Sequence, residues 1–166
     1  VFEQYDFSYD SSSLKDIFAT VRPDVTIFMG PYDENFDWSD ARLESVKYSA
    51  GLMNILSSYF LLNRGRFVYL SSNEVFNNNY YDNISENEEV SPKSFKSMAI
   101  VQGENMCSNY IHSSGMDGII IRYDNLYAVP EKNKNNIDNK CFSMCLEALK
   151  TGKISANGRE TFHCLF

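Results

Sequence analysis

The sequence predicts an α/β fold in which a parallel sheet lies between two layers of helices. Three short runs, at residues 25–29, 66–70 and 118–122, are almost entirely apolar, as is typical of strands buried on both faces. Segments of helical periodicity lie between them, and strands that alternate with helices form a parallel sheet. The chain has 166 residues, 43% of them hydrophobic, which suffices for one core. We therefore expect a single three-layer domain over residues 1–166.

Charge and hydropathy argue against two classes of partner. Acidic residues number 22 and basic residues 15, so the net charge is −7 and the isoelectric point is about 4.8. Nucleic acids and anionic membranes bind to clustered Lys and Arg, so we expect neither as a partner. A bilayer span needs about 18 apolar residues, and the most apolar stretch, Leu52–Leu62, is interrupted by polar side chains. Small molecules or other proteins are the expected partners.

The cysteines indicate a reducing compartment. The chain has four, Cys107, Cys141, Cys145 and Cys164, and no two of them form a CxxC pair. A domain of this size needs no disulfide framework, so we expect free thiols and a cytoplasmic location. Cys141 and Cys145 have helical i, i+4 spacing and Cys164 follows His163, which is one way to build a metal site. Thiols on an apolar helix are more often core residues, so we expect no metal.

The first elements follow from short-range signals. Residues 1–7 have the composition of a strand that ends at Asp6. Residues 11–20 predict a helix, because apolar residues recur at helical spacing behind a run of serines that can cap it. A Pro-Asp pair then leads into the strand predicted at residues 25–29.

The longest predicted helix spans residues 40–63. Ser39 can cap its N-terminus, and Gly65 follows its C-terminus. Apolar residues recur along the helix and predict its buried stripe. The stripe comprises Leu43, Val46, Ala50, Met53 and Phe60. The strand predicted at residues 66–70 follows directly.

A polar segment separates this strand from the next helix. Residues 73–90 are rich in Asn and Glu, which predicts a surface loop. The pair Ser91-Pro92 predicts a helix start, because proline is tolerated in the first turn. This helix is expected to run to about His112, before Gly115.

The C-terminal part continues the alternation. After the strand at residues 118–122 we expect a helix at residues 138–151, closed by Gly152. Residues 153–166 predict a final pair of strands around an Asn-Gly turn.

Four stretches match motifs that occur together in one family, in the same order and at similar spacing. They are RPDVTIFMG at residues 22–30, FVYLSSNEVF at 67–76, SPKSF at 91–95 and IRYDNLY at 121–127. These resemble, in turn, the motifs RPDxVIHLA, FxxxSSxxV[YF], PxSxY and LRxxNVY of the extended short-chain dehydrogenase/reductase superfamily, in its NAD-dependent epimerase/dehydratase family. The resemblance covers nearly the whole chain and implies a partial Rossmann-like fold.

The resemblance also implies that the chain is the central part of a longer protein. In the family, a glycine-rich GxxGxxG turn and a helix N-terminus hold the pyrophosphate of the cofactor, and none of the eight glycines forms this pattern. The chain resembles family members from their third strand onward and stops before their small substrate-binding domain. We therefore expect NAD or NADP as the cofactor of the full-length parent, and no detectable NAD affinity for this fragment alone.

Five residues match positions near the cofactor in the family. They are Asp6, Phe28, Met29, Gly30 and Tyr48. Asp6 corresponds to an aspartate that approaches the adenine, and a turn former at the end of a strand is the alternative. Tyr48 departs from the family, which usually has an asparagine there that helps to organise the proton relay.

The catalytic positions also depart from the family pattern. Family members use a Tyr-x-x-x-Lys pair, in which the lysine cation lowers the tyrosine pKa, and a Ser or Thr that orients the substrate oxygen. Ser72 matches this serine, but Phe95 stands at the tyrosine position and Ala99 at the lysine position. None of the eleven tyrosines has a lysine four residues further on. Phenylalanine cannot carry a proton, so the resemblance predicts a degenerate site.

Other side chains leave alternatives open. Lys96 could bend toward the site, although a solvated first turn is the simpler role for Lys93 and Lys96. Tyr80 or Tyr81 could supply a phenol from the long loop. Ser72 could instead end a buried strand and satisfy a neighbouring amide.

The resemblance implies a nucleotide-sugar-like ligand. Asn125 and Glu74 match substrate positions, and Glu86 lies where the family often frames the sugar, with solvation in an acidic cluster as its alternative. Trp38, the only tryptophan, precedes the long helix near where a ligand would pass. A lid over the edge of the core is the more ordinary role for an aromatic residue there.

Three hypotheses about function follow. The chain is part of an NAD(P)-dependent nucleotide-sugar epimerase, dehydratase or reductase; or it descends from one and only binds a dinucleotide or nucleotide sugar; or its long helices serve as a dimerisation scaffold. The replaced tyrosine and lysine favour the second hypothesis over the first, although an enzyme with an atypical acid or base stays open.

Overall fold

The structure is a computed structural model that describes residues 12–30, 38–62, 65–76, 84–85, 87–123 and 147–152. By internal contacts the chain divides into two compact units, Val1–Arg122 and Tyr123–Phe166. We describe each unit by itself, and a single domain over the whole chain stays a prediction. The elements predicted at residues 1–7 and 153–166 lie outside the described residues.

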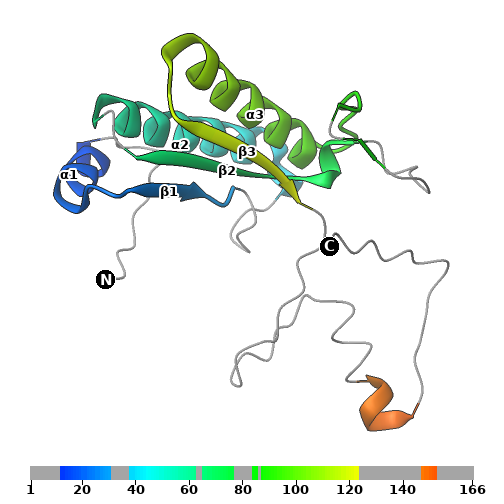
Figure 1. Cartoon of the computed structure of the whole chain (residues 1–166). Coiled ribbons are helices and arrows are strands. Elements are labelled where there is room, and N and C mark those ends of the chain that lie inside the picture. Colours follow the sequence, from blue (N-terminus) through cyan, green and yellow to red (C-terminus); the bar gives the residue numbers. More distant parts are fainter. Residues whose placement is uncertain are drawn as a thin grey trace. The chain divides into compact units, whose positions relative to one another are not determined.

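A parallel sheet organises the first part of the chain (Figure 1). Its strands are β1 (Val25–Phe28), β2 (Arg66–Ser72) and β3 (Gly118–Tyr123), in the order β1-β2-β3. β1 and β2 are paired in register from Val25 opposite Arg66 to Phe28 opposite Tyr69. Three predicted strands and the α/β class are therefore confirmed.

Helices connect the strands and pack against one another. They are α1 (Ser12–Val21), α2 (Ala41–Leu62) and α3 (Phe95–Ser114), with short 3-10 turns η1 (Trp38–Asp40) and η2 (Asn73–Val75). α1 contacts α2, α2 contacts α3, and α3 contacts β2. In the second unit, residues 147–151 are helical, within the helix predicted at 138–151, and Gly152 follows with a φ of 70°.

Two helices begin at different residues from those predicted. In the first turn of α2, the Oδ1 of Asp40 accepts the N–H of Leu43 at 3.1 Å, one residue after the predicted cap Ser39. α3 begins at Phe95 rather than at Pro92, because Ser94 and Ser97 form a capping box in which each side chain binds the backbone N–H of the other. At the other end, Gly115 closes α3 with a φ of 68°, as predicted.

The buried face of α2 also differs from the predicted stripe. Leu43, Val46 and Met53 are exposed, at 37%, 59% and 42%. The buried apolar side chains are instead Tyr48, Leu52, Leu56 and Tyr59. α2 carries apolar residues on more than one face, so its periodicity did not identify which face packs on the sheet.

The core between sheet and helices is rich in aromatic rings. Phe28 stacks on Tyr69 with ring centroids 5.8 Å apart and an interplanar angle of 12°. Tyr59 packs edge-on against Phe67 from the neighbouring strand, at 5.4 Å. Aromatic rings in such geometries stabilise a core by more than the burial of their area alone, so these contacts stabilise the packing of the helices on this face of the sheet.

The opposite face of the sheet is open in the first unit. Val25 and Ile27 of β1 are 52% and 57% exposed, and Ile119 and Ile121 of β3 are 48% and 41% exposed. Side chains alternate between the two faces of a strand, and α1, α2 and α3 cover the other one. We expected helices on both faces of the sheet. Among the described residues of this unit, the helices lie on one face.

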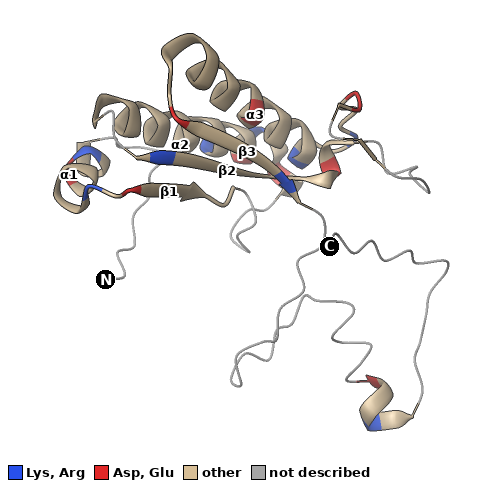
Figure 2. Cartoon of the chain, viewed as in Figure 1, with Lys and Arg blue, Asp and Glu red and all other residues tan. Residues whose placement is uncertain are grey.

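Charged residues are distributed over several elements (Figure 2). Lys15 lies on α1, Lys47 on α2, Arg66 on β2, Lys96 on α3 and Arg122 on β3. Acidic residues lie among them, and four of these cations pair with carboxylates within the described residues. The exclusion of nucleic acid as a partner stays a prediction from the chain's negative charge.

Candidate functional site

Ser72 lies at the end of β2, where the chain enters η2. Its hydroxyl accepts the N–H of Glu74 at 3.1 Å and so caps this short turn. The residue is 5% exposed. Ser72 thus performs the amide-satisfying role that we weighed as an alternative to catalysis, and we name residues 72–76 the Ser72 turn.

Lys96 reaches this turn from the first turn of α3. Its Nζ lies 2.9 Å from Oε1 of Glu74, and the two side chains are 27% and 39% exposed. Glu74, expected to face the substrate, and Lys96, one of the open alternatives, are therefore brought together beside Ser72.

Phe95 and Ala99 face elsewhere. Phe95 is 62% exposed, and Ala99 is 3% exposed in the core cluster that includes Tyr48 and Leu52 of α2. Ile100, one residue beyond Ala99, is fully buried against Val75 and Phe76 of the Ser72 turn, in a separate cluster.

The motif spacing explains this difference. Counted from Pro92 and Ser94, the last position of PxSxY falls on Lys96, one residue after Phe95. Four residues further on is Ile100. The spacing was therefore a signal in the sequence that our alignment on Phe95 missed.

A partly buried ion pair lies beside the same turn. Glu104 of α3 accepts hydrogen bonds from Nε and Nη2 of Arg122, both at 2.8 Å, and from the hydroxyl of Ser71 at 2.5 Å. The guanidinium of Arg122 lies 5.0 Å from the ring centroid of Phe76. The pair thus connects α3 and β3 to residues on both sides of Ser72, and its hydrogen bonds raise the pKa of Arg122.

Tyr48 is closed off from any ligand. It is 1% exposed, and its phenol hydrogen-bonds that of Tyr69, which donates to the carbonyl of Ile100 at 2.9 Å. Burial raises the pKa of Tyr48 well above its usual range. Gly103 of α3 makes this arrangement possible, because a Cβ there would collide with both phenols.

The carboxyl end of β1 is more open. Phe28 is buried, but Met29 is 62% exposed, and Gly30 has a φ of 65°, which favours glycine. Open α/β sheets bind ligands beyond the carboxyl ends of their strands. Met29 and Gly30 therefore lie at an exposed end of the sheet, whereas the phenol of Tyr48 is sealed in the core, and the roles of all three toward a cofactor stay predictions.

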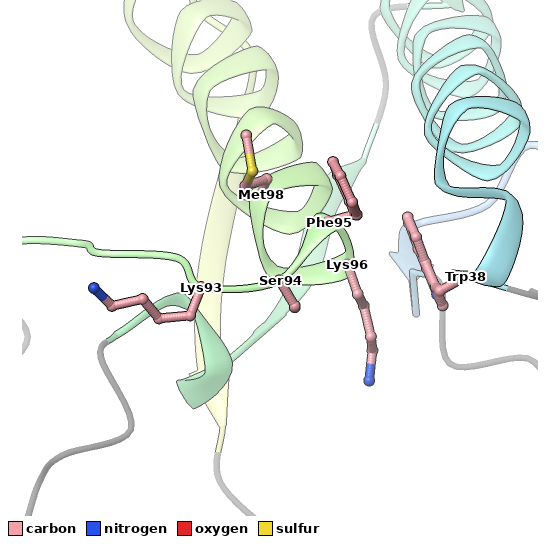
Figure 3. A pocket seen from close by; sticks show the side chains of 6 residues that line it. All are labelled: Trp38, Lys93, Ser94, Phe95, Lys96 and Met98. Atoms are coloured by element: carbon pink, nitrogen blue, oxygen red, sulfur yellow. The ribbon is translucent and has the colours of Figure 1, made fainter.

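A hollow of about 440 Å³ lies beside Lys96 (Figure 3). It is lined by Trp38, Lys93, Ser94, Phe95, Lys96 and Met98. In Figure 3 the rings of Trp38 and Phe95 face each other, Lys96 extends beneath them, and Lys93 points away. Sequence reasoning noted Trp38 but did not join it to α3, since the two are 57 residues apart from Trp38 to Phe95.

Several predicted residues lie outside the described part of the chain. These are Asp6, Tyr80, Tyr81, Glu86, Asn125, Cys141, Cys145, His163 and Cys164. Among the described residues, no group of three or more His, Cys, Asp or Glu side chains could hold a metal ion. No described helix is both long and apolar enough to cross a membrane.

Comparison with solved structures places the fold. An L-threonine 3-dehydrogenase from a metagenome superposes with a TM-score of 0.74 over 91% of this chain, at 22% identity. UDP-glucose 4-epimerase from Brucella ovis, solved with NAD, gives 0.63 over 75%, at 19% identity. RMD from Pseudomonas aeruginosa, solved with NADPH, gives 0.64 over 90%, at 19% identity.

These matches cover 49%, 38% and 51% of the three solved chains, so this chain spans about half their length or less. A search of curated proteins finds no match. The model of the NAD dependent epimerase/dehydratase family matches residues 2–162.

Proposed function

Because this chain belongs to the NAD-dependent epimerase/dehydratase family, we propose that it is the central part of a nucleotide-sugar epimerase, dehydratase or reductase domain that has lost its catalytic pair. It binds a dinucleotide or a nucleotide sugar and does not transfer hydride. Relatives with this fold were solved with NAD or NADPH. The chain's own cofactor, substrate and cytoplasmic location are parts of this proposal.

The observation that carries the proposal is the set of side chains that α3 presents to the Ser72 turn. They are Lys96, paired with Glu74, and the buried Ile100. If the alignment is shifted by one residue, the pair becomes Phe95 and Ala99. Neither choice supplies a phenol with a lysine four residues on, so no base of the family's kind stands at this turn.

The buried tyrosines do not replace the missing phenol. Tyr48 and Tyr69 are 1% and 0% exposed and bind each other. A general base must come within hydrogen-bond reach of the proton that it removes. The raised pKa of Tyr48 further disfavours a phenolate.

The full-length protein retains places for the two halves of a ligand. Met29 and Gly30 lie at the carboxyl end of β1, and Glu74 and Lys96 lie after β2. NAD or NADP, when bound, would supply a nicotinamide that accepts or donates hydride. The residues of this chain would then orient a ligand without moving its proton.

The test is titration of full-length protein with NADH, followed by calorimetry, and assay of the conversion of UDP-glucose by analysis of the sugar product, because an epimerase or dehydratase returns the hydride to the sugar and leaves no net change in NAD. We expect binding without turnover. Absence of NADH binding would contradict the cofactor proposal, and turnover that Ser72→Ala abolishes would contradict the loss of catalysis. For residues 1–166 alone we expect no measurable affinity, and a micromolar dissociation constant would count against that expectation.

An active enzyme with an atypical acid is the second candidate, and the contact between Lys96 and Glu74 favours it. An ammonium beside Ser72 is a hydrogen-bond donor that could polarise a carbonyl oxygen. The same assay decides between the candidates. Turnover that Lys96→Met abolishes, while NADH binding is kept, would favour this candidate over the first.

A homodimer through the long helices is compatible with either candidate. Val46 and Met53 of α2 and Met98 of α3 are 59%, 42% and 54% exposed. Exposed apolar side chains on neighbouring helices favour association. Light scattering during size-exclusion chromatography measures the mass, and a strict monomer at all concentrations would exclude the dimer.

A further inference from the structure

We infer that the hollow between Trp38 and Phe95 binds the flat ring of a ligand, and that Lys96 binds an anionic oxygen of the same ligand. The ligand class is a planar unsaturated ring that is joined, directly or through a sugar, to phosphate or carboxylate, as in a nucleotide. This inference deepens the proposed function, on which it rests, because it names side chains that would hold one part of such a ligand.

The walls of the hollow suit a ring. Phe95 and Met98 are 62% and 54% exposed, although large apolar side chains are usually buried. Trp38 is half-buried and faces Phe95 across the gap (Figure 3). A volume of about 440 Å³ lies within the range of small-molecule sites. Stacking between two aromatic side chains is a common way to hold a planar ring.

The charge at the hollow suits an anion. Two of its six described lining residues are lysines, and the ammonium of one of them, Lys96, also pairs with the carboxylate of Glu74 at 2.9 Å. Lys96 extends beneath the two rings, whereas Lys93 points away (Figure 3). A ring seated between Trp38 and Phe95 would thus have one ammonium close to it.

Glu74 holds the ammonium of Lys96 in place before a ligand binds. It binds Nζ of Lys96 at 2.9 Å, and its own N–H is fixed by Ser72. A long lysine side chain loses rotamer freedom when it binds a ligand, and a side chain that is already held loses less. An ammonium has three N–H donors, so a ligand oxygen can share it with the carboxylate.

The test uses full-length protein and three probes: uridine diphosphate, which has both ring and charge, uridine, which has the ring alone, and pyrophosphate, which has the charge alone. We expect uridine diphosphate to bind more tightly than either part. Lys96→Met should weaken it about tenfold, as expected for a lost charge-assisted hydrogen bond. Trp38→Leu should weaken uridine and uridine diphosphate about fivefold and leave pyrophosphate unchanged.

Lys47→Met is the matched control, because Lys47 also pairs with a carboxylate, Glu44 at 3.1 Å, but does not line the hollow. We expect its affinities to equal those of the wild type. The inference is overturned if uridine diphosphate binds no more tightly than about 1 mM, if Lys96→Met and Lys47→Met have equal effects, or if Trp38→Leu changes the oligomeric state instead of the affinity.

The NADH titration of the same proteins separates this inference from the proposed function. If the wild-type protein does not bind NADH, the proposed function is contradicted. NADH binding that persists while the Lys96 and Trp38 variants bind uridine diphosphate normally contradicts only the inference about the hollow.

Discussion

Two stripes of α3, one residue apart, have opposite roles. The core-facing stripe packs on α2 and the aromatic core and comprises Ala99, Gly103 and Cys107, whereas Phe95, one turn before Ala99, is 62% exposed. The turn-facing stripe contacts the Ser72 turn and comprises Lys96, Ile100 and Glu104. Both repeat every four residues, as neighbours on one face of a helix do.

The difference shows how closely a site depends on helix rotation. Gly103 lets α3 approach Tyr48 and Tyr69, since a Cβ there would collide with both phenols. This contact directs the core-facing stripe toward α2 and the next residue of each turn toward Ser72. Which residue of α3 meets the Ser72 turn therefore follows from packing some seven residues away, from Gly103 to Lys96.

The largest loss of stability is expected from a substitution in the turn-facing stripe. Glu104→Ala leaves the guanidinium of Arg122 without its carboxylate and should lower the free energy of unfolding by about 3 kcal/mol, as for a broken buried ion pair. Glu104→Gln keeps an acceptor and should cost less. Urea denaturation measures both, and a loss below about 1 kcal/mol for Glu104→Ala would contradict the importance of this pair.

The next largest loss of stability is expected from a substitution in the core-facing stripe. Gly103→Ala should lower the free energy of unfolding by about 1–2 kcal/mol, because overpacking outweighs the better helix propensity of alanine. The matched test combines it with Tyr69→Phe, which removes the oxygen nearest to the new Cβ. The double variant should be less destabilised than the sum of the single variants, and strict additivity would show that the collision is absent.

A third effect concerns Cys107, which closes the core-facing stripe. Burial, with a smaller contribution from Glu104, raises the pKa of its thiol from 9.0 to about 12. The folded state therefore holds the proton more tightly, so stability is complete below pH 9.0 and falls as the pH rises toward about 12. At pH 10 the loss should be about 1 kcal/mol.

The reactivity of this thiol provides a second measurement. Cys107 is fully buried, so iodoacetamide at pH 8 should label it in urea but not in native protein. Peptide mass spectrometry distinguishes it from the other three cysteines. Rapid labelling of Cys107 in native protein would show that the core-facing stripe opens.

The smallest change in stability is expected from substitutions at Phe95 and Lys96, in the first turn of α3. Lys96→Met removes a partly exposed ion pair and should change the free energy of unfolding by about 0.5 kcal/mol or less. Phe95→Ala should have a similarly small effect, since Phe95 is 62% exposed. A loss above about 1.5 kcal/mol for either variant would mean that the residue is structural rather than available to a ligand.

Local signals in the sequence predicted the strands and the end of α3 correctly, because apolar runs and a glycine after a helix act through neighbouring residues. Gly115 ended α3 as predicted, and the apolar runs became β1, β2 and β3. The predicted start of α3 at Pro92 was wrong, because the reciprocal bonds of Ser94 and Ser97 cap the helix three residues later than the first helical position we assigned.

Predictions about faces were less successful. The expected stripe of α2 included Val46 and Met53, which are exposed, while Tyr48 and Tyr59 are buried. A helix that carries apolar side chains on several faces can pack in more than one orientation. The phenols of Tyr48 and Tyr59 find partners in Tyr69 and the carbonyl of Gly65, which only the folded chain provides.

The sequence by itself determined the fold class and the family, because backbone propensity, apolar runs and motif spacing are properties of the chain read in order. The tertiary structure decided that Lys96 meets Glu74, that Tyr48 is sealed in the core and that Trp38 faces Phe95. These contacts join residues far apart in the sequence, and they depend on helix rotations set by close packing, which local patterns do not encode.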